Sequence, residues 1–291
     1  MIWLIGCGGM LGKELASVFK ANGIPFTGTD SETDITDAEM LNMFCRDKHF
    51  EWIVNCSAYT AVDKAEAEEQ RAYDINCIGV ENIARCADRI GAKVIHFSTD
   101  YVFNGESSFP YKETDMTAPT SAYGRTKLAG ETALIGNTEK YFIFRISWLY
   151  GFYGNNFVNT MLRLMKERDS LSVVSDQVGS PTYTLTLAQN IFAIISADSS
   201  AYGIYHYSDE GVISWYDFAV KIYQLGNQYG ILSTKVDIKP IGSSEYPSPV
   251  KRPAWSVFAK EKVASLSFIK LHNWEENLGN YLKRIYEHEK I

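Results

Sequence analysis

The chain has 291 residues and a formal net charge of −7, and 46% of its residues are hydrophobic. This composition is typical of a folded protein with a sizeable core, and the acidic balance disfavours a nucleic-acid surface. No apolar run reaches the roughly 20 residues that a membrane-spanning helix needs. The chain enters a strand pattern at once, without signal-peptide features, and its five cysteines lack metal-binding spacing. We therefore expect a cytoplasmic protein that binds neither membranes nor nucleic acid.

The chain opens with the pattern of a nucleotide-binding unit. Residues 1–5 are an apolar strand pattern, and a helical pattern begins at Leu11. The glycines between them suit the turn of a dinucleotide-binding βαβ unit. In such a unit Gly6 permits the tight turn, Gly9 lets backbone N–H groups approach a pyrophosphate, and Gly12 allows close helix packing.

A second strand, at residues 25–29, leads directly to Asp30. A carboxylate at this position accepts hydrogen bonds from an adenosine ribose and repels a 2′-phosphate. No lysine or arginine follows until Arg46, so the local charges favour NADH over NADPH.

The next segment offers two interpretations. Asp34 and Ile35 are placed to contact the adenine, with Thr36 or Asp37 capping the following helix. The alternative is that Asp34 only marks the start of that helix. The residues alone do not choose between these interpretations.

Two further strands are predicted at residues 52–55 and 93–97. In open α/β sheets ligands bind at the carboxyl ends of the strands. The small residues after the first of these strands suit backbone that passes a bound cofactor. Thr99 follows the second strand and can present its hydroxyl to a substrate oxygen, whereas His96 lies inside the strand and is predicted to be a packed core histidine.

An acidic run separates these two strands. Glu66, Glu68 and Glu69 are predicted to form a solvated helix face rather than a metal site. A long helix then passes through Asn76 and ends near Gly91, because glycine favours helix C-termini.

Tyr123 and Lys127 stand four residues apart, so on a helix their side chains share one face. A free phenol has a pKa of about 10. A nearby ammonium favours the phenolate and lowers that pKa, which suits a general acid or base. The same lysine can reach a ribose hydroxyl. The alternative is an exposed amphipathic pair without chemistry.

A fifth strand at residues 141–146 is followed by Trp148, and the pattern then becomes less regular. We predict a doubly wound α/β fold with a Rossmann-type parallel sheet in residues 1–150. Residues 151–291 are predicted to form mainly a smaller α/β substrate-binding domain, from which some segments return to the first. The expected later elements are helices at 155–168, 185–196, 215–224 and 274–286, and short strands at 171–174 and 203–206.

These motifs together resemble the extended short-chain dehydrogenase/reductase family, and within it the dTDP-4-dehydrorhamnose reductases. The resemblance covers nearly the whole chain. The segments that carry it are 6–12, 58–66, 98–105, 123–131, 147–151, 179–182 and 252–253. Thr99 followed by Asp-Tyr-Val-Phe is more specific to this group than the tyrosine–lysine pair.

The resemblance implies reduction of the C4 keto group of dTDP-4-dehydro-6-deoxy-L-mannose to dTDP-L-rhamnose with NADPH or NADH. The implied partner is thus a small nucleotide sugar, and the implied state is a monomer or homodimer. The implied catalytic residues are Tyr123, Lys127 and Thr99. The implied cofactor contacts are Gly6, Gly9, Met10, Leu11, Gly12, Asp30, Asp34, Ile35, Ala58, Tyr59, Thr60, Phe97, Tyr123 and Lys127. The implied substrate contacts are Thr99, Asp100, Tyr101 and Trp148.

Some members of this family dimerise through magnesium held by glutamates. Glu14 matches one such position, but residues 183–186 read Tyr-Thr-Leu-Thr where a glutamate is expected. We therefore predict no metal site.

Two rival functions are left open. An epimerase, another nucleotide-sugar 4-ketoreductase or a dehydratase of this family would use the same cofactor and tyrosine. A 4,6-dehydratase commonly has Asp-Glu after the threonine, and here Asp100 is followed by Tyr101. A non-catalytic regulatory subunit would keep the glycine loop and lose part of the triad, whereas all three triad residues are present.

Overall fold

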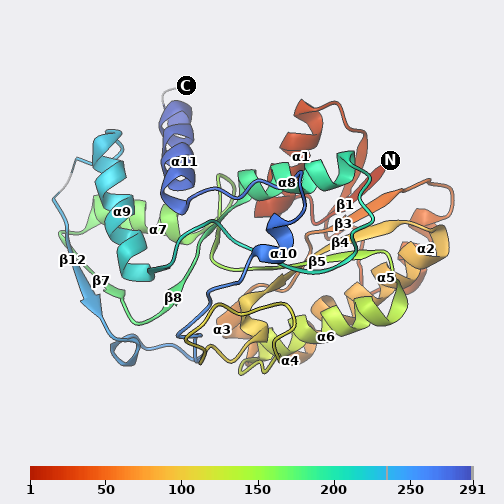
Figure 1. Ribbon diagram of the computed structural model, residues 1–291, viewed down its shortest axis with the longest axis horizontal. Helices are drawn as coiled ribbons and strands as arrows, with labels where there is room; N and C mark the ends of the chain where they lie inside the picture. Colours follow the sequence, from red (N-terminus) through yellow and green to blue (C-terminus); the bar gives the residue numbers. More distant parts are fainter. Residues whose placement is uncertain (234, 290–291) are drawn as a thin grey trace.

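The computed structural model describes residues 1–233 and 235–289. Its centre is a sheet of six parallel strands in the order β10-β5-β4-β3-β1-β2 (Figure 1). The predicted doubly wound α/β fold is therefore confirmed. The strands are β1 (Ile2–Ile5), β2 (Phe26–Thr29), β3 (Trp52–Asn55), β4 (Lys93–Thr99), β5 (Tyr141–Ile146) and β10 (Gly203–Tyr207).

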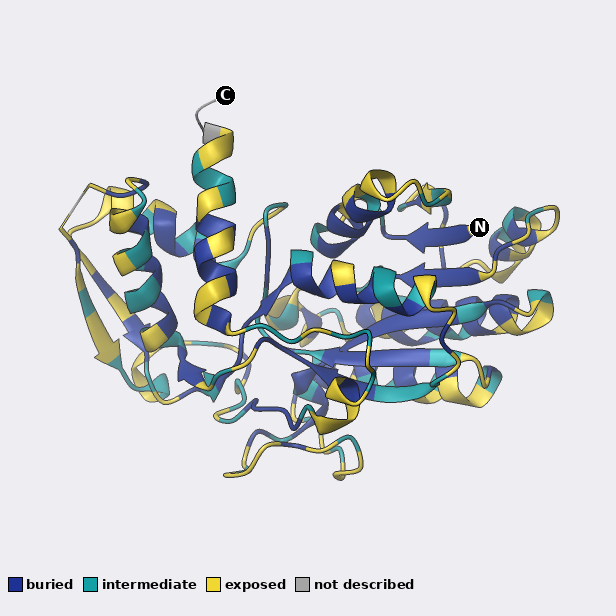
Figure 2. Ribbon diagram, turned by 45° about the horizontal axis from the view of Figure 1, so that its top comes forward, coloured by how far each residue is buried: buried dark blue, intermediate teal, exposed yellow. Residues whose placement is uncertain are grey.

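Helices cover both faces of this sheet. On one face α1 packs against α8, and on the other α5 contacts both α2 and α6. Figure 2 shows the strands buried between these layers, with exposed residues on the outer sides of the helices. The helices are α1 (Met10–Ala21), α2 (Ala38–Cys45), α5 (Gly79–Ile90), α6 (Ala122–Asn137) and α8 (Thr184–Ser196).

The long helix predicted to pass through Asn76 begins at Glu69 and contains a π turn. α4 (Glu69–Tyr73), η1 (Asp74–Ile78) and α5 follow one another without a break, and Gly91 ends α5 at a φ of 74°. The π turn locally changes which side chains share a helix face. Asn76 lies in this turn, is 1% exposed and bonds to both Tyr59 and α6.

The rest of the chain builds a second apolar core beside the sheet (Figure 1). This core contains Met165, Phe218, Leu278 and Tyr281, all fully buried. Its helices are α7 (Phe157–Glu167), α9 (Trp215–Gln228) and α11 (Trp274–Glu289). Short paired strands complete it: β6 (Leu149–Tyr150), β7 (Ser170–Val174), β8 (Val178–Gly179), β9 (Thr182–Tyr183), β11 (Ile213–Ser214) and β12 (Asp237–Ile241).

Two segments after residue 150 lie in the layers of the first sheet. β10 pairs with β5 as an edge strand of that sheet, and α8 packs on α1. The remaining short helices are α3 (Val62–Ala65), η2 (Asp100–Val102), η3 (Ser243–Glu245) and α10 (Glu261–Ala264).

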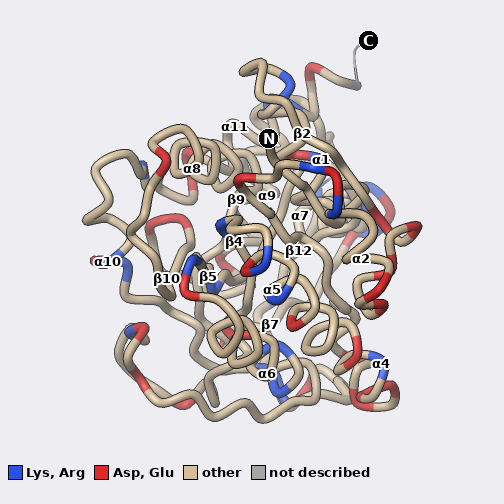
Figure 3. The backbone as a smooth tube through the Cα atoms, turned by 90° about the vertical axis from the view of Figure 1, so that its right-hand side faces the viewer, with Lys and Arg blue, Asp and Glu red and all other residues tan. Residues whose placement is uncertain are grey.

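No helix in the described ranges is both long and apolar enough to cross a membrane. Figure 3 shows acidic and basic positions interspersed along the backbone, without a continuous basic track in that view.

A buried ion pair joins α6 to β5. Arg145 Nη2 lies 2.7 Å from Glu131 Oε2, and Arg145 Nε donates to Glu131 Oε1 at 3.0 Å. Ser98 of β4 donates to the same carboxylate. Arg145 is 3% and Glu131 1% exposed, so water cannot replace either partner. Loss of one charge would leave the other buried and unpaired, which is strongly destabilising.

We therefore expect Arg145→Met to lower the free energy of unfolding by about 3–5 kcal/mol. Urea denaturation followed by circular dichroism measures this change. Arg163→Met is the control, because Arg163 pairs with Glu167 on the exposed surface of α7. A surface pair contributes at most about 1 kcal/mol. Equal losses in the two variants would contradict the importance assigned to the buried pair.

Candidate active site

The glycine loop between β1 and α1 has the tight geometry that the sequence predicts. Gly6 has a φ of 73°, and a Cβ on it would lie 2.8 Å from the backbone nitrogen of Ser57. A Cβ on Gly12 would lie 2.0 Å from the carbonyl oxygen of Gly6. Gly9 is the N-cap of α1 and supplies no side-chain cap. The first turn of α1 thus keeps backbone N–H groups for an anion.

A cavity of about 570 Å³ opens beside this loop. Six of the predicted cofactor residues line it: Gly6, Gly9, Asp30, Asp34, Ile35 and Ala58. A glycine cradle that any side chain would fill, next to a helix N-terminus, fits the pyrophosphate of a dinucleotide. The side chain of Leu11 packs in the core, so this residue offers a cofactor only its backbone.

Asp30 lies at the end of β2, as predicted, but its carboxylate already has partners. Oδ2 accepts a hydrogen bond from the Gly8 backbone at 2.7 Å, and Oδ1 accepts one from Ser31 at 2.9 Å. The carboxylate therefore also holds the glycine loop against β2. Asp30 also lines the cavity, so the cavity carries a negative charge of the kind that disfavours a 2′-phosphate.

The alternatives for the segment after Asp30 are partly resolved. Asp37 caps α2, because its Oδ1 accepts from the backbone of Glu39 and Met40 at 2.9 and 3.0 Å. Asp34 instead closes a turn with Thr36 and lines the cavity.

Arg71 of α4 lines the same cavity, although the sequence pattern did not predict it there. Arg71 lies outside the segment from Asp30 to Arg46 and reaches the cavity from a different helix. A cation at this cavity weakens the argument that local charges favour NADH.

The N-terminus of α6 is capped by two side chains. Ser121 Oγ accepts from the Gly124 backbone at 3.1 Å, and Glu66 accepts from the Ala122 backbone at 2.8 Å. Glu69 also binds Arg125 through two hydrogen bonds of 3.0 Å. The acidic run is largely exposed, as predicted, and it also anchors the helix that carries Tyr123.

Asn76 fixes the other side of this helix. Its amide nitrogen donates to Thr126 Oγ1 at 3.1 Å and to the carbonyl oxygen of Tyr59 at 3.2 Å. Its Oδ1 accepts from the Tyr59 backbone at 2.8 Å. The segment of Ala58, Tyr59 and Thr60 is thus held next to α6, and no local sequence signal marks this link.

Tyr123 lies beside Thr99 at the carboxyl end of β4. Burial and the nearby charge of Asp100 raise the pKa of the phenol, and a hydrogen bond with Thr99 acts more weakly in the opposite direction. The net pKa lies above the ordinary value, where the sequence led us to expect a lowered one. The main cause is burial of the phenol, and Lys127, whose Nζ donates to Phe97 O at 2.6 Å, does not offset it. Tyr123 is therefore a protonated phenol at neutral pH.

A smaller cavity of about 130 Å³ lies next to this tyrosine site. Three of the four predicted substrate residues line it, namely Asp100, Tyr101 and Trp148. Burial raises the pKa of Asp100 to about 6, and its Oδ1 accepts from Thr99 at 2.9 Å. The other lining residues, which the sequence reasoning missed as substrate contacts, are Gln177, Trp215, Arg252, Pro253 and Ser256.

Trp148 has a backbone φ of 48°, which is unusual for a bulky residue. Its indole stacks on Trp215 with ring centroids 3.6 Å apart. A Cβ on Gly179 would lie 2.8 Å from the indole of Trp148. Trp148 is thus held in a strained conformation at the cavity by contacts with residues distant in sequence.

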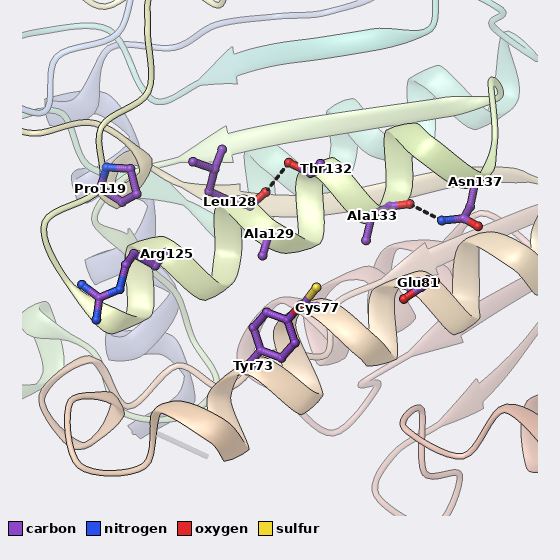
Figure 4. A pocket seen from close by; sticks show the side chains of 10 residues that line it. All are labelled: Tyr73, Cys77, Glu81, Pro119, Arg125, Leu128, Ala129, Thr132, Ala133 and Asn137. Carbon is purple, nitrogen blue, oxygen red and sulfur yellow. Dashed lines mark hydrogen bonds between the residues drawn. The ribbon is translucent and has the colours of Figure 1, made fainter.

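Another cavity of about 570 Å³ lies on the outer side of α6 (Figure 4). Ala129 of α6 points toward Tyr73 and Cys77 there. None of the predicted catalytic, cofactor or substrate residues lines it, so it is separate from the candidate active site.

Glu14, the residue that matches a magnesium ligand in some relatives, is paired within the chain. Its Oε1 accepts from Arg284 Nη1 at 2.7 Å, and Thr184 donates to its Oε2 at 3.3 Å. The carboxylate is 0% exposed. No group of three or more metal-ligating side chains occurs in the part of the chain that the structure describes.

Comparison with known proteins identifies the family. A model of the RmlD substrate binding domain matches residues 1–287. A dTDP-4-dehydrorhamnose reductase of Aggregatibacter actinomycetemcomitans is 40% identical over 95% of this chain and 96% of its own length. The chain belongs to the dTDP-4-dehydrorhamnose reductase family.

Solved structures of this family have the same fold. A dTDP-4-dehydrorhamnose reductase of Clostridium acetobutylicum superposes with a TM-score of 0.92 at 40% identity, covering 98% of this chain and 99% of its own. The Bacillus anthracis enzyme in complex with NADP gives a TM-score of 0.91 at 38% identity, covering 97% and 98%. The family resemblance drawn from the motifs is therefore confirmed.

The Asp30 carboxylate yields a test of the cofactor site. Asp30→Ala removes a negative charge that repels a 2′-phosphate, so the kcat/KM for NADPH should rise relative to that for NADH, roughly 10-fold. Steady-state kinetics with both cofactors measure the ratio. Asp88→Ala is the control for a lost surface carboxylate, because Asp88 is exposed near the C-terminal end of α5. An unchanged ratio in Asp30→Ala would show that Asp30 does not act on the ribose.

Proposed function

We propose that this protein reduces the C4 keto group of dTDP-4-dehydro-6-deoxy-L-mannose (dTDP-4-dehydro-L-rhamnose) to dTDP-L-rhamnose, the last step of dTDP-rhamnose biosynthesis. The observation that carries the proposal is that Tyr123 lies beside Thr99 and Asp100, and that Asp100 lines the smaller cavity together with Trp148. Membership of the dTDP-4-dehydrorhamnose reductase family supports the identity of the sugar nucleotide. The proposed cofactor is NADPH or NADH. The relative that was solved in complex with NADP supports this choice.

The chain's own residues orient the ketone and supply a proton. The chemistry that a bound reduced nicotinamide supplies is hydride transfer. Tyr123 donates its proton to the developing alkoxide, which its raised pKa permits because the phenol is still protonated at neutral pH. Thr99 orients the carbonyl oxygen, and Lys127 binds the cofactor ribose and lies one helical turn from the tyrosine.

The glycine loop with Met10, Asp34, Ile35 and Phe97 completes the proposed cofactor contacts. The proposed substrate contacts are Asp100, Tyr101 and Trp148. We assign residues 1–150 mainly to cofactor binding and residues 151–291 mainly to substrate binding. The proposed enzyme is cytoplasmic and acts as a monomer or homodimer without a bridging metal.

The decisive assay follows NADPH or NADH consumption with freshly generated dTDP-4-dehydro-6-deoxy-L-mannose. Rapid oxidation of the cofactor with formation of dTDP-L-rhamnose is the expected result. Absence of turnover with this sugar nucleotide, in protein that binds the cofactor, would refute the proposed activity.

The role of Tyr123 is tested by Tyr123→Phe, which keeps the ring and removes the proton donor. Turnover should fall by roughly 10²–10⁴-fold, while the Kd for NADPH changes little. Tyr73→Phe, at an exposed tyrosine outside the site, should keep wild-type kcat. Near-normal turnover of Tyr123→Phe would mean that another group is the acid.

The position of Trp148 is tested by Gly179→Ala, because the added methyl group would collide with the indole. Displacement of the indole should raise the KM for the sugar nucleotide roughly 10-fold, equivalent to about 1.4 kcal/mol. The Kd for NADPH should not change. Gly136→Ala is the matched control, since nothing lies within 4 Å of a Cβ there. A wild-type KM in Gly179→Ala would argue that the sugar does not contact Trp148.

A further inference from the structure

Lys127 contacts a histidine that the proposed reaction does not use. Lys127 Nζ lies 3.5 Å from His96 Nε2, besides donating to the carbonyl oxygen of Phe97 at 2.6 Å. Lys127 is 2% and His96 0% exposed, so water does not screen this contact. The position of the imidazole proton therefore decides whether the contact favours the ammonium or the neutral amine.

The groups behind the imidazole determine that position. The backbone N–H of Ser57 donates to Asn55 Oδ1 at 3.0 Å. A backbone N–H can only donate, so the amide oxygen of Asn55 faces Ser57 and its nitrogen faces His96. Asn55 Nδ2 lies 3.1 Å from His96 Nδ1 and donates to it. His96 Nδ1 therefore carries a lone pair, and the proton of the neutral ring is on Nε2.

This tautomer points an N–H group at Lys127. An ammonium has three N–H bonds and no lone pair, so it cannot accept from His96. A neutral amine keeps two N–H bonds, one of which suffices for Phe97, and offers a lone pair to His96 Nε2–H. The contact is therefore favourable only when Lys127 is neutral.

A second buried histidine, His206, carries its proton on the other ring nitrogen. His206 Nδ1 donates to the carbonyl oxygen of Tyr111 at 2.9 Å, which leaves a lone pair on Nε2. That lone pair faces Arg145 Nη1 at 3.4 Å and accepts from it. The chain thus contains a histidine that stabilises a buried cation, and His96 is oriented the other way.

The charged groups around Lys127 come from three elements. Glu131 lies one turn further along α6, and its carboxylate is paired with Arg145 of β5. Tyr123 lies one turn before it, and Asp100 of η2 acts on Tyr123. Burial lowers the pKa of Lys127 to about 8, although the charge of Glu131 acts in the opposite direction. Both protonation states of Lys127 are therefore accessible near neutral pH.

We propose that His96 is a positioning residue that stabilises neutral Lys127, so that the lysine can return a proton to Tyr123 after each reduction. The proposal rests on the reductase function proposed above. The Tyr123 O–H bond breaks as the new O–H bond forms on the sugar. A Lys127 N–H bond then breaks as the phenol re-forms, and His96 keeps its proton and donates to the resulting amine. Solvent water supplies the proton that restores the ammonium.

The tautomer is tested without any substrate. Long-range ¹⁵N–¹H correlation spectra of protein labelled in the histidine imidazole rings report which nitrogen carries the proton. The His96 signals are assigned from their loss in His96→Gln. We expect His96 to be neutral and protonated at Nε2, and His206 to be protonated at Nδ1. A proton on Nδ1 of His96, or on both of its nitrogens, would overturn the proposal.

The effect on Lys127 is tested by the pH dependence of kcat. The rate should fall at high pH as Lys127 loses its proton. His96→Leu removes the donor to the neutral amine, so the pKa of Lys127 should rise and the basic limb should move up by about 1 pH unit. His96→Gln places an amide N–H near the same point and should restore the wild-type limb. The Kd for NADPH should be unchanged in both.

The outcomes separate this proposal from the reductase assignment. His206→Gln is the matched control at a buried histidine and should leave the limb in place. If the fall in kcat at high pH occurs at the same or a lower pH in His96→Leu, the role of His96 is overturned. Added apolar burial alone would lower the pKa of Lys127. A wild-type protein that reduces no sugar nucleotide overturns the reductase assignment instead, and the NMR experiment still decides the tautomer.

Discussion

The anchoring of α6 is the constraint on which the candidate site depends. This helix carries both Tyr123 and Lys127, and it is held at three levels by residues from elsewhere in the chain. Glu66 caps its first turn, Asn76 bonds to its second, and Arg145 pairs with its buried Glu131. Because each anchor comes from a different element, the register of α6 against β4 and β5 is over-determined. The distance between the tyrosine and Thr99 follows from that register.

The sheet determines where the rest of the site assembles. β1, β3 and β4 are parallel and adjacent, so the glycine loop, the segment after Asn55 and Thr99 all lie at one edge. The second core supplies the opposite wall through Trp148 and Trp215. β10 and α8 return from that part of the chain to the sheet, which joins the two cores through continuous backbone. The small cavity therefore lies where the two cores meet.

The sequence predicts those features that depend on local backbone geometry. The glycine loop, the helix of Tyr123 and the strand ends are recognisable because a turn, a cap or a periodic pattern lies within a few residues. Arg71, Trp215 and Arg252 reach the two cavities from distant segments, and no local pattern marks such an approach. The same reason explains the acidic run near Glu66, whose partners on α6 lie 56 residues away. A carboxylate that caps a distant helix and a carboxylate on a solvated helix face lie in the same kind of local sequence.

The raised pKa of Tyr123 suits a reduction better than an oxidation. An alcohol oxidation requires a base, for which a lowered phenol pKa is an advantage. A ketone reduction requires an acid that is still protonated when the alkoxide forms, so burial and the charge of Asp100 act in the useful direction. The group that must change protonation state between turnovers is then Lys127. Burial lowers the pKa of this lysine to about 8. In this arrangement the tyrosine keeps its proton until the alkoxide takes it, and the lysine is the residue near neutrality that can replace it.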